Sequence, residues 1–445
     1  MLIRFNVENY LSFNEKVEFS LIANQERRLS THFVKGRDIN ILKSAVVYGA
    51  NASGKSNLIK AIEFSSKAIL KGIQSINPDN CHYRLNKQNL QKPTVFNYEF
   101  KIYEKYYSYG YGIQLNKAQI VEEWLFEIGK IKEVKIFERF INSDGIHEIE
   151  IGNGLRLTGK AKTRFDVYRA DFQKSDNLLF LSEINRKSID DIPEARAFTD
   201  VYEWFAKKLV ILKPDSRFAG LNFVGDNEEM SDTFNKFMSV FQTGINKIVT
   251  DEIDFDSFDI PKTVRQGLVE KMNKANITIF QHKGIFYSLF KTSKSGLKIR
   301  KIGLEHLSDK GESVVFDIDD ESDGTKRLFD LIPALHHLSK SDAVFVIDEV
   351  DRSLHSKLTY GLFDLFFRLT ANNESQLIAT THESLLLDLN LLRRDEIWFI
   401  EKEKNSSRIY SLDQFQERSD KVVGKSYLLG RYGAIPVIKG LSNLM

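Results

Sequence analysis

Short, continuous apolar runs occur at three places in the chain, and each run is followed within three residues by polar side chains. The runs are residues 45–48, 343–347 and 377–379. A run of this length is typical of a strand that is buried on both faces, as in the middle of a parallel sheet. Ligand-binding groups belong at the carboxyl ends of such strands. The pattern therefore predicts an α/β fold with functional residues after each run.

The chain between the first two runs changes character along its length. Residues 94–151 alternate between apolar and polar positions, which predicts an antiparallel β-meander. Its expected strands are residues 95–100, 106–114, 120–128 and 134–141. Residues 176–275 instead show helical spacing, at 194–212, at 231–248 and from Pro261 to Lys274. Sustained heptads are absent, so we expect a compact lid or arm and no long coiled coil.

These patterns divide the chain into three parts. We expect an N-terminal lobe over residues 1–160, an inserted helical lid or arm domain over 161–305, and a C-terminal lobe over 306–445. The two lobes together would form one α/β head, with a mixed sheet, an antiparallel β-subdomain and a large, mainly helical insert between them.

Composition narrows the classes of protein. A chain of 445 residues is long enough for two or three cores, and its formal net charge of +2 gives no global case for nucleic-acid binding. The single cysteine, Cys81, excludes an internal disulfide and a cysteine-built zinc site. We find no apolar stretch of about 18 residues that would span a membrane. Residues 1–8 alternate like a strand and lack the apolar core of a signal peptide, so we expect a cytoplasmic protein.

The residues after the first apolar run have the spacing G-x-x-x-x-G-K-[ST] of a phosphate-binding loop, and helical spacing follows it. Glycines let the backbone curl around a phosphate chain, and the freed N–H groups then point at the anion. We expect Lys55 to reach the β- and γ-phosphates of ATP, and the Ser56 hydroxyl to bind Mg²⁺. The residues predicted to hold the nucleotide are Gly49, Asn51, Ala52, Ser53, Gly54, Lys55, Ser56 and Asn57.

The second and third runs end in groups that suit the same chemistry. Asp348 and Glu349 follow the second run, and His382 follows the third. We expect Asp348 to belong to the Mg²⁺ shell and Glu349 to act as general base on the attacking water. His382 would stand beside the γ-phosphate. A capped strand end is the commoner meaning of such an acidic pair, and the phosphate-binding loop upstream favours the functional one.

Ser322, Gly324 and Thr325 lie just upstream of the second run and open a helical stretch. Ser322 and Gly324 are placed to offer a hydroxyl and backbone N–H groups at a helix N-terminus, which would make a second anion-binding nest. An acidic cluster precedes and overlaps this nest; its members are Asp317, Asp319, Asp320 and Asp323. We interpret the cluster as a polar loop rather than a metal site.

The order of these motifs resembles the ABC-class ATPases, and specifically the soluble branch with the SMC, Rad50 and RecF heads. The resemblance covers residues 1–75 and 310–400. It implies that residues 322–325 are the signature motif, that Asp351 lies in the D-loop and that His382 is the switch histidine. The signature here reads Ser-Asp-Gly-Thr where the family usually has Ser-Gly-Gly. A loop glutamine that senses Mg²⁺ usually precedes the β-subdomain, and Gln91 is the candidate.

Four segments narrow the resemblance to the prokaryotic AAA15-type ATPases of abortive-infection and restriction-linked phage-defence operons, such as the AbiL and RloA types. The segments are residues 9–13, 321–325, 348–355 and the tail 427–436. The tail motif has no assignable chemistry, and we interpret it as a packed turn.

The resemblance also implies partners. In ABC-class proteins the phosphate loop of one chain and the signature of another hold the same ATP, so we expect a two-fold homodimer or a higher even-numbered assembly. The resemblance to phage-defence ATPases further implies a switch ATPase that controls an effector protein encoded nearby. The alternatives are a DNA-maintenance ATPase of the RecF or SMC type and, less favoured, the nucleotide-binding subunit of a transporter. DNA-stimulated activity would indicate the former, and copurification with a permease the latter.

Two local basic runs leave nucleic-acid binding open. The first comprises Lys160, Lys162, Arg164, Arg169 and Lys174, and the second comprises Lys283, Lys291, Lys294, Lys298, Arg300 and Lys301. Aromatic residues interleave with the second run, and basic residues among aromatics can bind nucleic acid. The alternative is a solvated surface that lysines keep soluble.

Overall fold

The computed structural model describes residues 1–172, 175–187, 189, 191–214, 228–273, 277–283, 285–292, 296–415 and 422–436. The chain forms two compact units. The first comprises Met1–Pro214, Ser341–Val350 and Phe363–Met445, and the second comprises Asp215–Lys340 and Asp351–Leu362. In the described part of the chain, no helix is long and apolar enough to cross a membrane.

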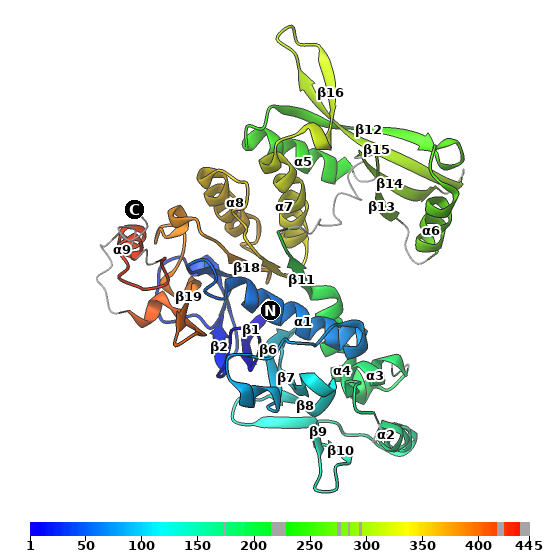
Figure 1. Ribbon diagram of the computed structural model, residues 1–445, viewed down its shortest axis with the longest axis vertical. Helices are drawn as coiled ribbons and strands as arrows, with labels where there is room; N and C mark the ends of the chain where they lie inside the picture. The colour runs from blue at the N-terminus through cyan, green and yellow to red at the C-terminus, as the bar shows by residue number, and fades with distance from the viewer. Residues whose placement is uncertain are drawn as a thin grey trace. The chain divides into compact units, whose positions relative to one another are not determined.

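A six-stranded sheet forms the centre of the first unit (Figure 1). Its order is β11 (Leu209–Leu212), β17 (Val344–Ile347), β18 (Gln376–Thr380), β5 (Ser44–Tyr48), β19 (Ile397–Glu403) and β20 (Ser406–Ser411). Neighbours are parallel except for β20, which is antiparallel to β19. Every residue of β5, β17 and β18 is buried, so the three apolar runs are inner strands as predicted.

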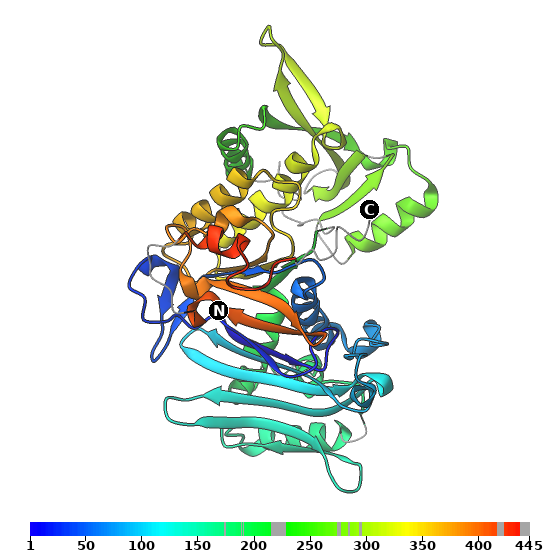
Figure 2. The same cartoon turned by 60° about the vertical axis from the view of Figure 1, so that its left-hand side comes forward.

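A seven-stranded antiparallel sheet makes the second layer of this unit (Figure 2). Its order is β10 (His147–Ile151), β9 (Glu133–Ile141), β8 (Gln119–Ile128), β7 (Lys105–Gln114), β6 (Thr94–Ile102), β1 (Leu2–Glu8) and β2 (Val17–Ser20). The predicted meander corresponds to β6–β9. Helix α1 (Lys55–Lys71) shares one buried apolar cluster with both sheets.

Short helices follow the meander. They are α2 (Gly159–Phe172), α3 (Phe180–Arg186) and α4 (Arg196–Glu203), and a π-helical turn, Trp204–Lys208, leads into β11. The buried Glu123 carboxylate accepts the N–H groups of Phe180 (2.7 Å) and Leu181 (3.0 Å), and so holds the start of α3 against β8. The helix predicted to reach residue 212 ends at 208, because residues 209–212 pair in parallel with β17.

The second unit is built on another antiparallel sheet. Its order is β12 (Ile245–Asp254), β15 (Gly296–Leu307), β14 (Ile285–Thr292) and β13 (Ile277–His282), and β16 (Ser313–Asp317) also pairs with β15. The helices are α5 (Glu228–Val240), α6 (Lys262–Met272) and α7 (Asp323–Lys340). Helix α8 (Ser356–Leu369) begins in this unit and continues in the first.

The predicted inserted domain, residues 161–305, differs from this division. Residues 161–214 belong to the first unit, and the remainder, with residues 306–340, belongs to the second. The remainder is also richer in strand than helical spacing suggested. The helix expected over 231–248 ends at Val240, and β12 begins at Ile245 after Gly244, whose φ is +81°. Helix α6 ends at Met272, and the predicted end, Lys274, lies outside the described residues.

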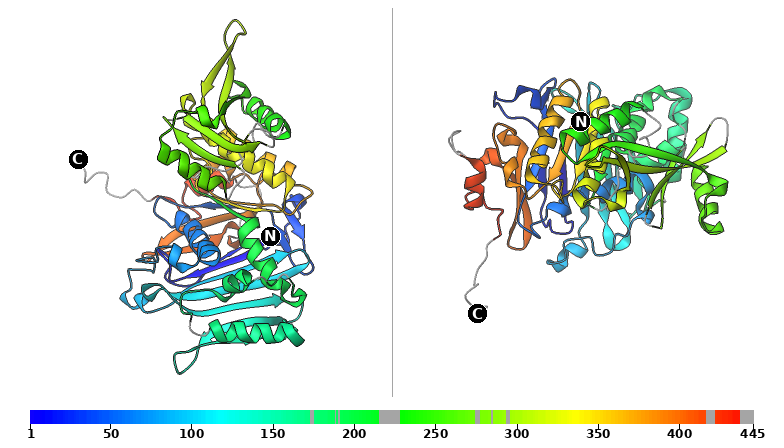
Figure 3. Two further views of the ribbon diagram at one scale, coloured as in Figure 1. Left: turned by 90° about the vertical axis from the view of Figure 1, so that its right-hand side faces the viewer. Right: turned by 90° about the horizontal axis from the view of Figure 1, so that it is seen from above.

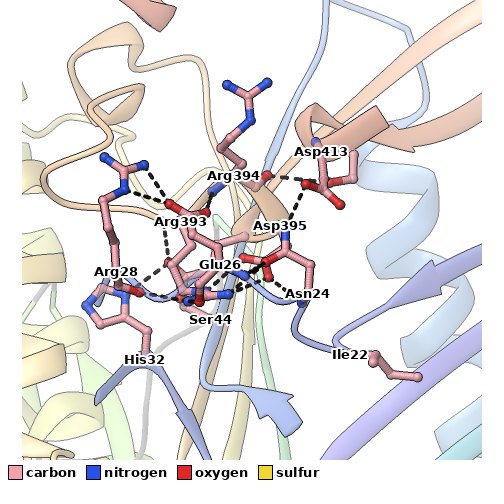
Figure 4. Close-up of polar contacts among 12 residues, drawn as sticks. Ile22, Asn24, Glu26, Arg28, His32, Ser44, Arg393, Arg394, Asp395 and Asp413 are labelled. Atoms are coloured by element: carbon pink, nitrogen blue, oxygen red, sulfur yellow. Dashed lines mark hydrogen bonds and ion pairs between the residues drawn. The ribbon is translucent and has the colours of Figure 1, made fainter. Parts of the chain in front are cut away.

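A buried polar network joins the N-terminal segment of the chain to the start of β19 (Figure 4). The Glu396 carboxylate accepts hydrogen bonds from the Ser44 hydroxyl (2.8 Å) and the Arg393 N–H (2.7 Å), and lies 3.0 Å from Nδ1 of His32. The buried Arg393 guanidinium binds both oxygens of Asp395, at 2.9 and 2.8 Å. Burial raises the pKa of the Glu396 carboxyl, and the hydrogen bond with His32 opposes that rise.

We expect the His32→Ala substitution to destabilise the first unit by about 3 kcal/mol, because it removes one of the three hydrogen-bond partners of a carboxylate that stays buried. The urea midpoint of the wild-type and variant proteins measures the loss. His82 lies outside this network, and His82→Ala, as the control, should change the stability by less than about 0.5 kcal/mol. Equal midpoints for the wild-type and His32→Ala proteins would show that the contact with Glu396 contributes nothing.

Candidate nucleotide-binding site

The phosphate-binding loop connects the end of β5 to the start of α1, in the order that the sequence predicts. Ala52 and Gly54 have positive φ values of 62° and 122°. A Cβ atom on Gly49 would lie 2.4 Å from the carbonyl oxygen of Ile400, and one on Gly54 would lie 2.3 Å from the hydroxyl of Ser407. Both glycines are therefore required by close approach of β19 and β20, and Gly54 also by its backbone conformation.

A pocket of about 520 Å³ opens above this loop. The residues that line it are Ala50, Asn51, Ala52, Ser53, Gly54, Lys55, Ser56, Asn57, Glu349, His382 and Lys402. The structure thus brings Glu349 and His382, which follow two separate strands, to the phosphate-binding loop. The parallel order β17-β18-β5 explains this, because the carboxyl ends of all three strands meet at one edge of the sheet.

Ser56 and Asp348, the two residues predicted to bind Mg²⁺, are neighbours at this edge of the sheet. Oγ of Ser56 lies 3.4 Å from Oδ1 of Asp348. The Lys55 ammonium donates to the carbonyl oxygens of Gly49 (2.7 Å) and Ala50 (3.2 Å), which keeps it inside the loop. A hydroxyl and a carboxylate oxygen fit Mg²⁺, which takes oxygen ligands and completes its shell with water and phosphate.

Thr380, the last residue of β18, holds both acidic residues, and the sequence analysis missed it. Its hydroxyl donates to Oδ1 of Asp348 (2.5 Å) and accepts the backbone N–H of Glu349 (2.8 Å). Glu349 has a positive φ of 49°, an uncommon conformation for a non-glycine residue that surrounding contacts must maintain. The sequence did indicate a polar group at this position, because Thr380 ends a buried strand. That strand, β18, pairs with β17, which leads to Asp348.

Ser12 joins the N-terminal motif to the phosphate-binding loop. Its hydroxyl accepts hydrogen bonds from Nδ2 of Asn57 (2.8 Å) and from the hydroxyl of Ser407 (2.8 Å). The Ser407 hydroxyl lies 2.5 Å from the carbonyl oxygen of Ser53. The motif at residues 9–13 is itself a tight turn, with Asn9 and Leu11 at positive φ. These contacts give the motif a structural role in positioning the loop.

The tail motif packs behind the same loop. Helix α9 (Val423–Leu428) places Tyr427 against Tyr48, with the ring centroids 5.7 Å apart. The Tyr427 hydroxyl donates to the carbonyl oxygen of Ala434 (3.1 Å), and the Tyr410 hydroxyl donates to that of Tyr432 (2.6 Å). The motif is therefore a packed turn, as interpreted from the sequence.

Lys402 on β19 is a cation of the pocket that no sequence motif indicated. It is exposed and, within the described ranges, has no carboxylate within 4 Å. Because it lines the pocket beside the loop, we expect it to attract the phosphate chain of a bound nucleotide.

We expect Lys402→Ala to raise the KM for ATP about fivefold, and Lys402→Arg to keep it near the wild-type value, because an exposed charge contributes modestly. Steady-state ATPase assays at low salt measure the change. Lys425→Ala, on α9, is the control. An unchanged KM in Lys402→Ala would show that this cation does not contact the nucleotide.

Gln91 does not line the pocket. It is exposed after a 3₁₀ turn, Lys87–Leu90, and its side-chain oxygen lies 3.3 Å from Nε2 of Gln114. Its assignment as a metal-sensing residue stays a prediction.

The signature residues lie at the start of α7 in the second unit. The Ser322 hydroxyl accepts the N–H of Thr325 (3.1 Å) and so caps this helix. A Cβ atom on Gly324 would lie 2.7 Å from the carbonyl oxygen of Ser353, so this glycine permits close approach of the turn that begins at Asp351. The signature and the predicted D-loop are thus neighbours within this unit.

The acidic cluster beside the signature forms a turn. The Asp317 N–H donates to the Asp320 carboxylate (3.1 Å), and Asp317 also pairs with Lys301 (2.7 Å). Over the described residues, no group of three or more potential ligands could hold a metal ion. The polar-loop interpretation accounts for these contacts.

The fold and this pocket define a P-loop nucleotide-binding protein of the α/β class. The model of the family described as "AAA domain, putative AbiEii toxin, Type IV TA system" matches residues 44–148 and 167–388. The chain belongs to this family. No curated protein matches it.

Three solved structures of SMC heads are similar to the chain. The first is the SMC head domain of Thermotoga maritima, with 11% identity and a TM-score of 0.40; the match covers 92% of this chain and 98% of that one. The second is the Smc head bound to the C-terminal winged-helix domain of ScpA, with 17% identity, a TM-score of 0.38 and coverages of 92% and 97%. The third is the Smc head with an extended coiled coil bound to the C-terminal domain of ScpA from Pyrococcus furiosus, with 14% identity, a TM-score of 0.39 and coverages of 92% and 96%.

Proposed function

We propose that this protein is a Mg²⁺-dependent ATPase that works as a nucleotide-driven switch. The observation that carries the proposal is the pocket in which the phosphate-binding loop, Glu349 and His382 meet. Lys55 and the loop N–H groups bind the phosphate chain, and Ser56 and Asp348 hold the metal ion. Bound Mg²⁺ would neutralise charge on the β- and γ-phosphates.

Glu349 accepts a proton from the water that attacks the γ-phosphorus, as its position at the end of β17 allows. Thr380 orients this base through its backbone N–H, and His382 contacts the γ-phosphate from the neighbouring strand. In this mechanism the protein catalyses hydrolysis by positioning the reactants and neutralising charge. Slow turnover is sufficient for a switch.

We further propose that two copies sandwich two ATP molecules. The pocket lies in the first unit, whereas the signature residues Ser322, Gly324 and Thr325 and the D-loop residue Asp351 belong to the second. The capped N-terminus of α7 presents N–H groups that suit a phosphate, and in the proposed dimer those groups complete the site of the other copy. ATP then stabilises the dimer because it binds the pair and not the separate chains.

Ser322→Arg tests the sandwich. We expect this variant to bind ATP like the wild type and to stay monomeric with ATP and Mg²⁺, because a large cationic side chain would fill the space for the partner's γ-phosphate. Light scattering after size-exclusion chromatography measures the mass, and ATP affinity is measured in parallel. Ser143→Arg, on an exposed turn, should dimerise normally. A stable ATP-bound dimer of Ser322→Arg would refute the geometry.

We propose that the switch regulates an effector partner in antiphage defence in the cytoplasm of its host. The support is the description of the chain's own family, which names a toxin–antitoxin system and therefore a pair of proteins. Affinity purification of the Glu349→Gln protein with ATP and Mg²⁺, followed by mass spectrometry, tests this role. Stoichiometric recovery of a second, toxin-like protein is expected. Recovery with DNA and repair factors would instead favour a DNA-maintenance ATPase.

A further inference from the structure

The two basic runs differ in how their charges are compensated. In the second run, Lys298 and Arg300 both pair with Glu252 across the β12–β15 ladder, at 3.4 and 2.8 Å. Lys301 pairs with Asp317 at 2.7 Å. Lys294, in the same run, lies outside the described residues. These ion pairs are what a solvated sheet kept soluble by charges would show.

The first run instead borders a pocket of about 590 Å³ beside α2. Its lining residues are Ile151, Gly152, Asn153, Leu155, Arg156, Leu157, Lys162, Phe165, Asp166 and Arg169. Three of these are basic and one is acidic, so the lining carries a formal charge of +2 (3 − 1). Helix α2 lies at the end of the seven-stranded sheet that carries β9 and β10 (Figure 3). Lys174 of this run lies outside the described residues.

Most of the positive charge in this pocket has no compensating carboxylate. In the part of the chain that the structure describes, neither Arg156 nor Lys162 has an acidic group within 4 Å, and both are exposed. Arg169 has only the partly exposed Asp166, at 3.5 Å. Arg164, by contrast, pairs with Asp191 at 2.7 Å and does not line the pocket.

The acids of the neighbouring strand do not compensate these charges. Glu150 on β10 pairs with Lys135 (2.9 Å), and Glu148 accepts a hydrogen bond from Asn142 (2.7 Å). The first turn of α2 also carries lysines and no acidic residue. Cations in a first turn are opposed by the helix dipole, so the sequence keeps them there against a local electrostatic cost.

The walls of the pocket are fixed by the fold. The N–H groups of Gly152 and Gly154 donate to β9 carbonyl oxygens, at 2.9 and 2.8 Å. A Cβ atom on Gly152 would lie 2.2 Å from the carbonyl oxygen of Lys135. Leu155 and Phe165 are buried beneath the loop and the helix. The basic side chains therefore project from a rigid support, which reduces the entropy cost of binding.

We propose that this pocket binds consecutive phosphate groups of a nucleic-acid backbone. Lys162 and Arg169 are seven residues apart on one helix, or roughly 10 Å along its axis at 1.5 Å per residue. Arg156 extends the set onto the preceding loop. A single phosphate group is too small to meet cations over that length, whereas an extended polyanion can meet all three. The pocket holds no aromatic residue on its surface for base stacking, since its one ring, Phe165, is buried.

The test measures binding of a fluorescent 20-nucleotide single strand, and of a duplex of the same sequence, by anisotropy at several salt concentrations. The test variant combines Arg156→Gln, Lys162→Gln and Arg169→Gln. We expect at least tenfold weaker binding at 0.1 M salt, and a shallower slope of log K against log salt, by about one unit per lost phosphate contact. The charge-keeping variant Arg156→Lys, Lys162→Arg, Arg169→Lys should stay within about threefold of the wild type.

The matched control removes the same charge elsewhere, with Lys35→Gln, Lys87→Gln and Lys117→Gln at three exposed positions. It should bind like the wild type. Equal losses in the control and the test variant would overturn the proposal, because net charge alone would then explain binding. Absence of nucleic-acid binding by the wild type would also overturn it, as would full competition by equimolar pyrophosphate, which would assign the pocket to free phosphates. Basal ATPase activity, measured on every variant, should not change and separates this result from the proposed ATPase function.

Discussion

Replacing Lys55 with alanine is expected to weaken ATP binding by at least a factor of about one hundred, or about 3 kcal/mol. The Lys55 ammonium is buried and is held among the loop carbonyl oxygens, where it faces the space for the β- and γ-phosphates. Alanine removes a charge-assisted hydrogen bond and leaves the anion without its main counter-charge. Titration calorimetry with ATP and Mg²⁺, against the wild type, measures the loss.

Lys60→Ala is the matched control, because Lys60 lies on the same helix and is exposed outside the pocket. It should bind ATP with the wild-type affinity. Thermal unfolding without nucleotide should be similar for both variants, which separates a binding defect from a folding defect. Normal ATP binding by Lys55→Ala would rule out the assignment of this loop to phosphate.

Glu349→Gln is expected to lower the rate of ATP hydrolysis by roughly a thousandfold while ATP binding is kept. Glutamine has the shape of the glutamate and preserves the backbone bond to Thr380, but it cannot accept the proton of the attacking water. The proposed dimer should then accumulate, since its ATP is no longer consumed. Phosphate release under single-turnover conditions and the mass in solution measure both effects.

Glu403→Gln serves as the control, because Glu403 lies on β19, is exposed outside the pocket and pairs with Arg408 at the surface. Its hydrolysis rate should equal that of the wild type. If Glu349→Gln turns over ATP at the wild-type rate, Glu349 is not the base. If it is slow but does not accumulate as a dimer, the base is correct and the sandwich is not.

The sequence predicts the residues that line the pocket better than it predicts the residues that hold them in place. The loop residues share one contiguous motif, and Asp348, Glu349 and His382 each end a recognisable apolar run. Thr380 and Ser407 act through contacts between strands that are far apart in the chain, and Lys402 lines the pocket from one of those strands. Local spacing marks Thr380 as the polar end of a buried strand, but it does not show which strands pair, so the contacts of these residues became visible only in the structure.

The errors in secondary structure have a related cause. Residues 209–212 continue a helical pattern, but their four apolar side chains also suit the edge of a parallel sheet, and pairing with β17 decides their state. Strand pairing also competes with helical spacing at the end of α5. The helix stops before β12, because the residues of β12 pair along most of β15. Tertiary pairing outweighs the small intrinsic preferences of such segments.

The strand order has a consequence for how the protein is made. Tyr48, the residue before the phosphate-binding loop, pairs with Phe399, which is 351 positions later in the chain (399 − 48). At a synthesis rate of about 5–20 residues per second, roughly 20 to 70 seconds separate the two residues on the ribosome. For most of that interval the strands up to β10 can already pair, while β5 has neither of its final neighbours, β18 and β19. Nascent chains therefore carry an unpaired hydrophobic strand edge for much of their synthesis, and we expect them to depend on chaperones until β19 emerges.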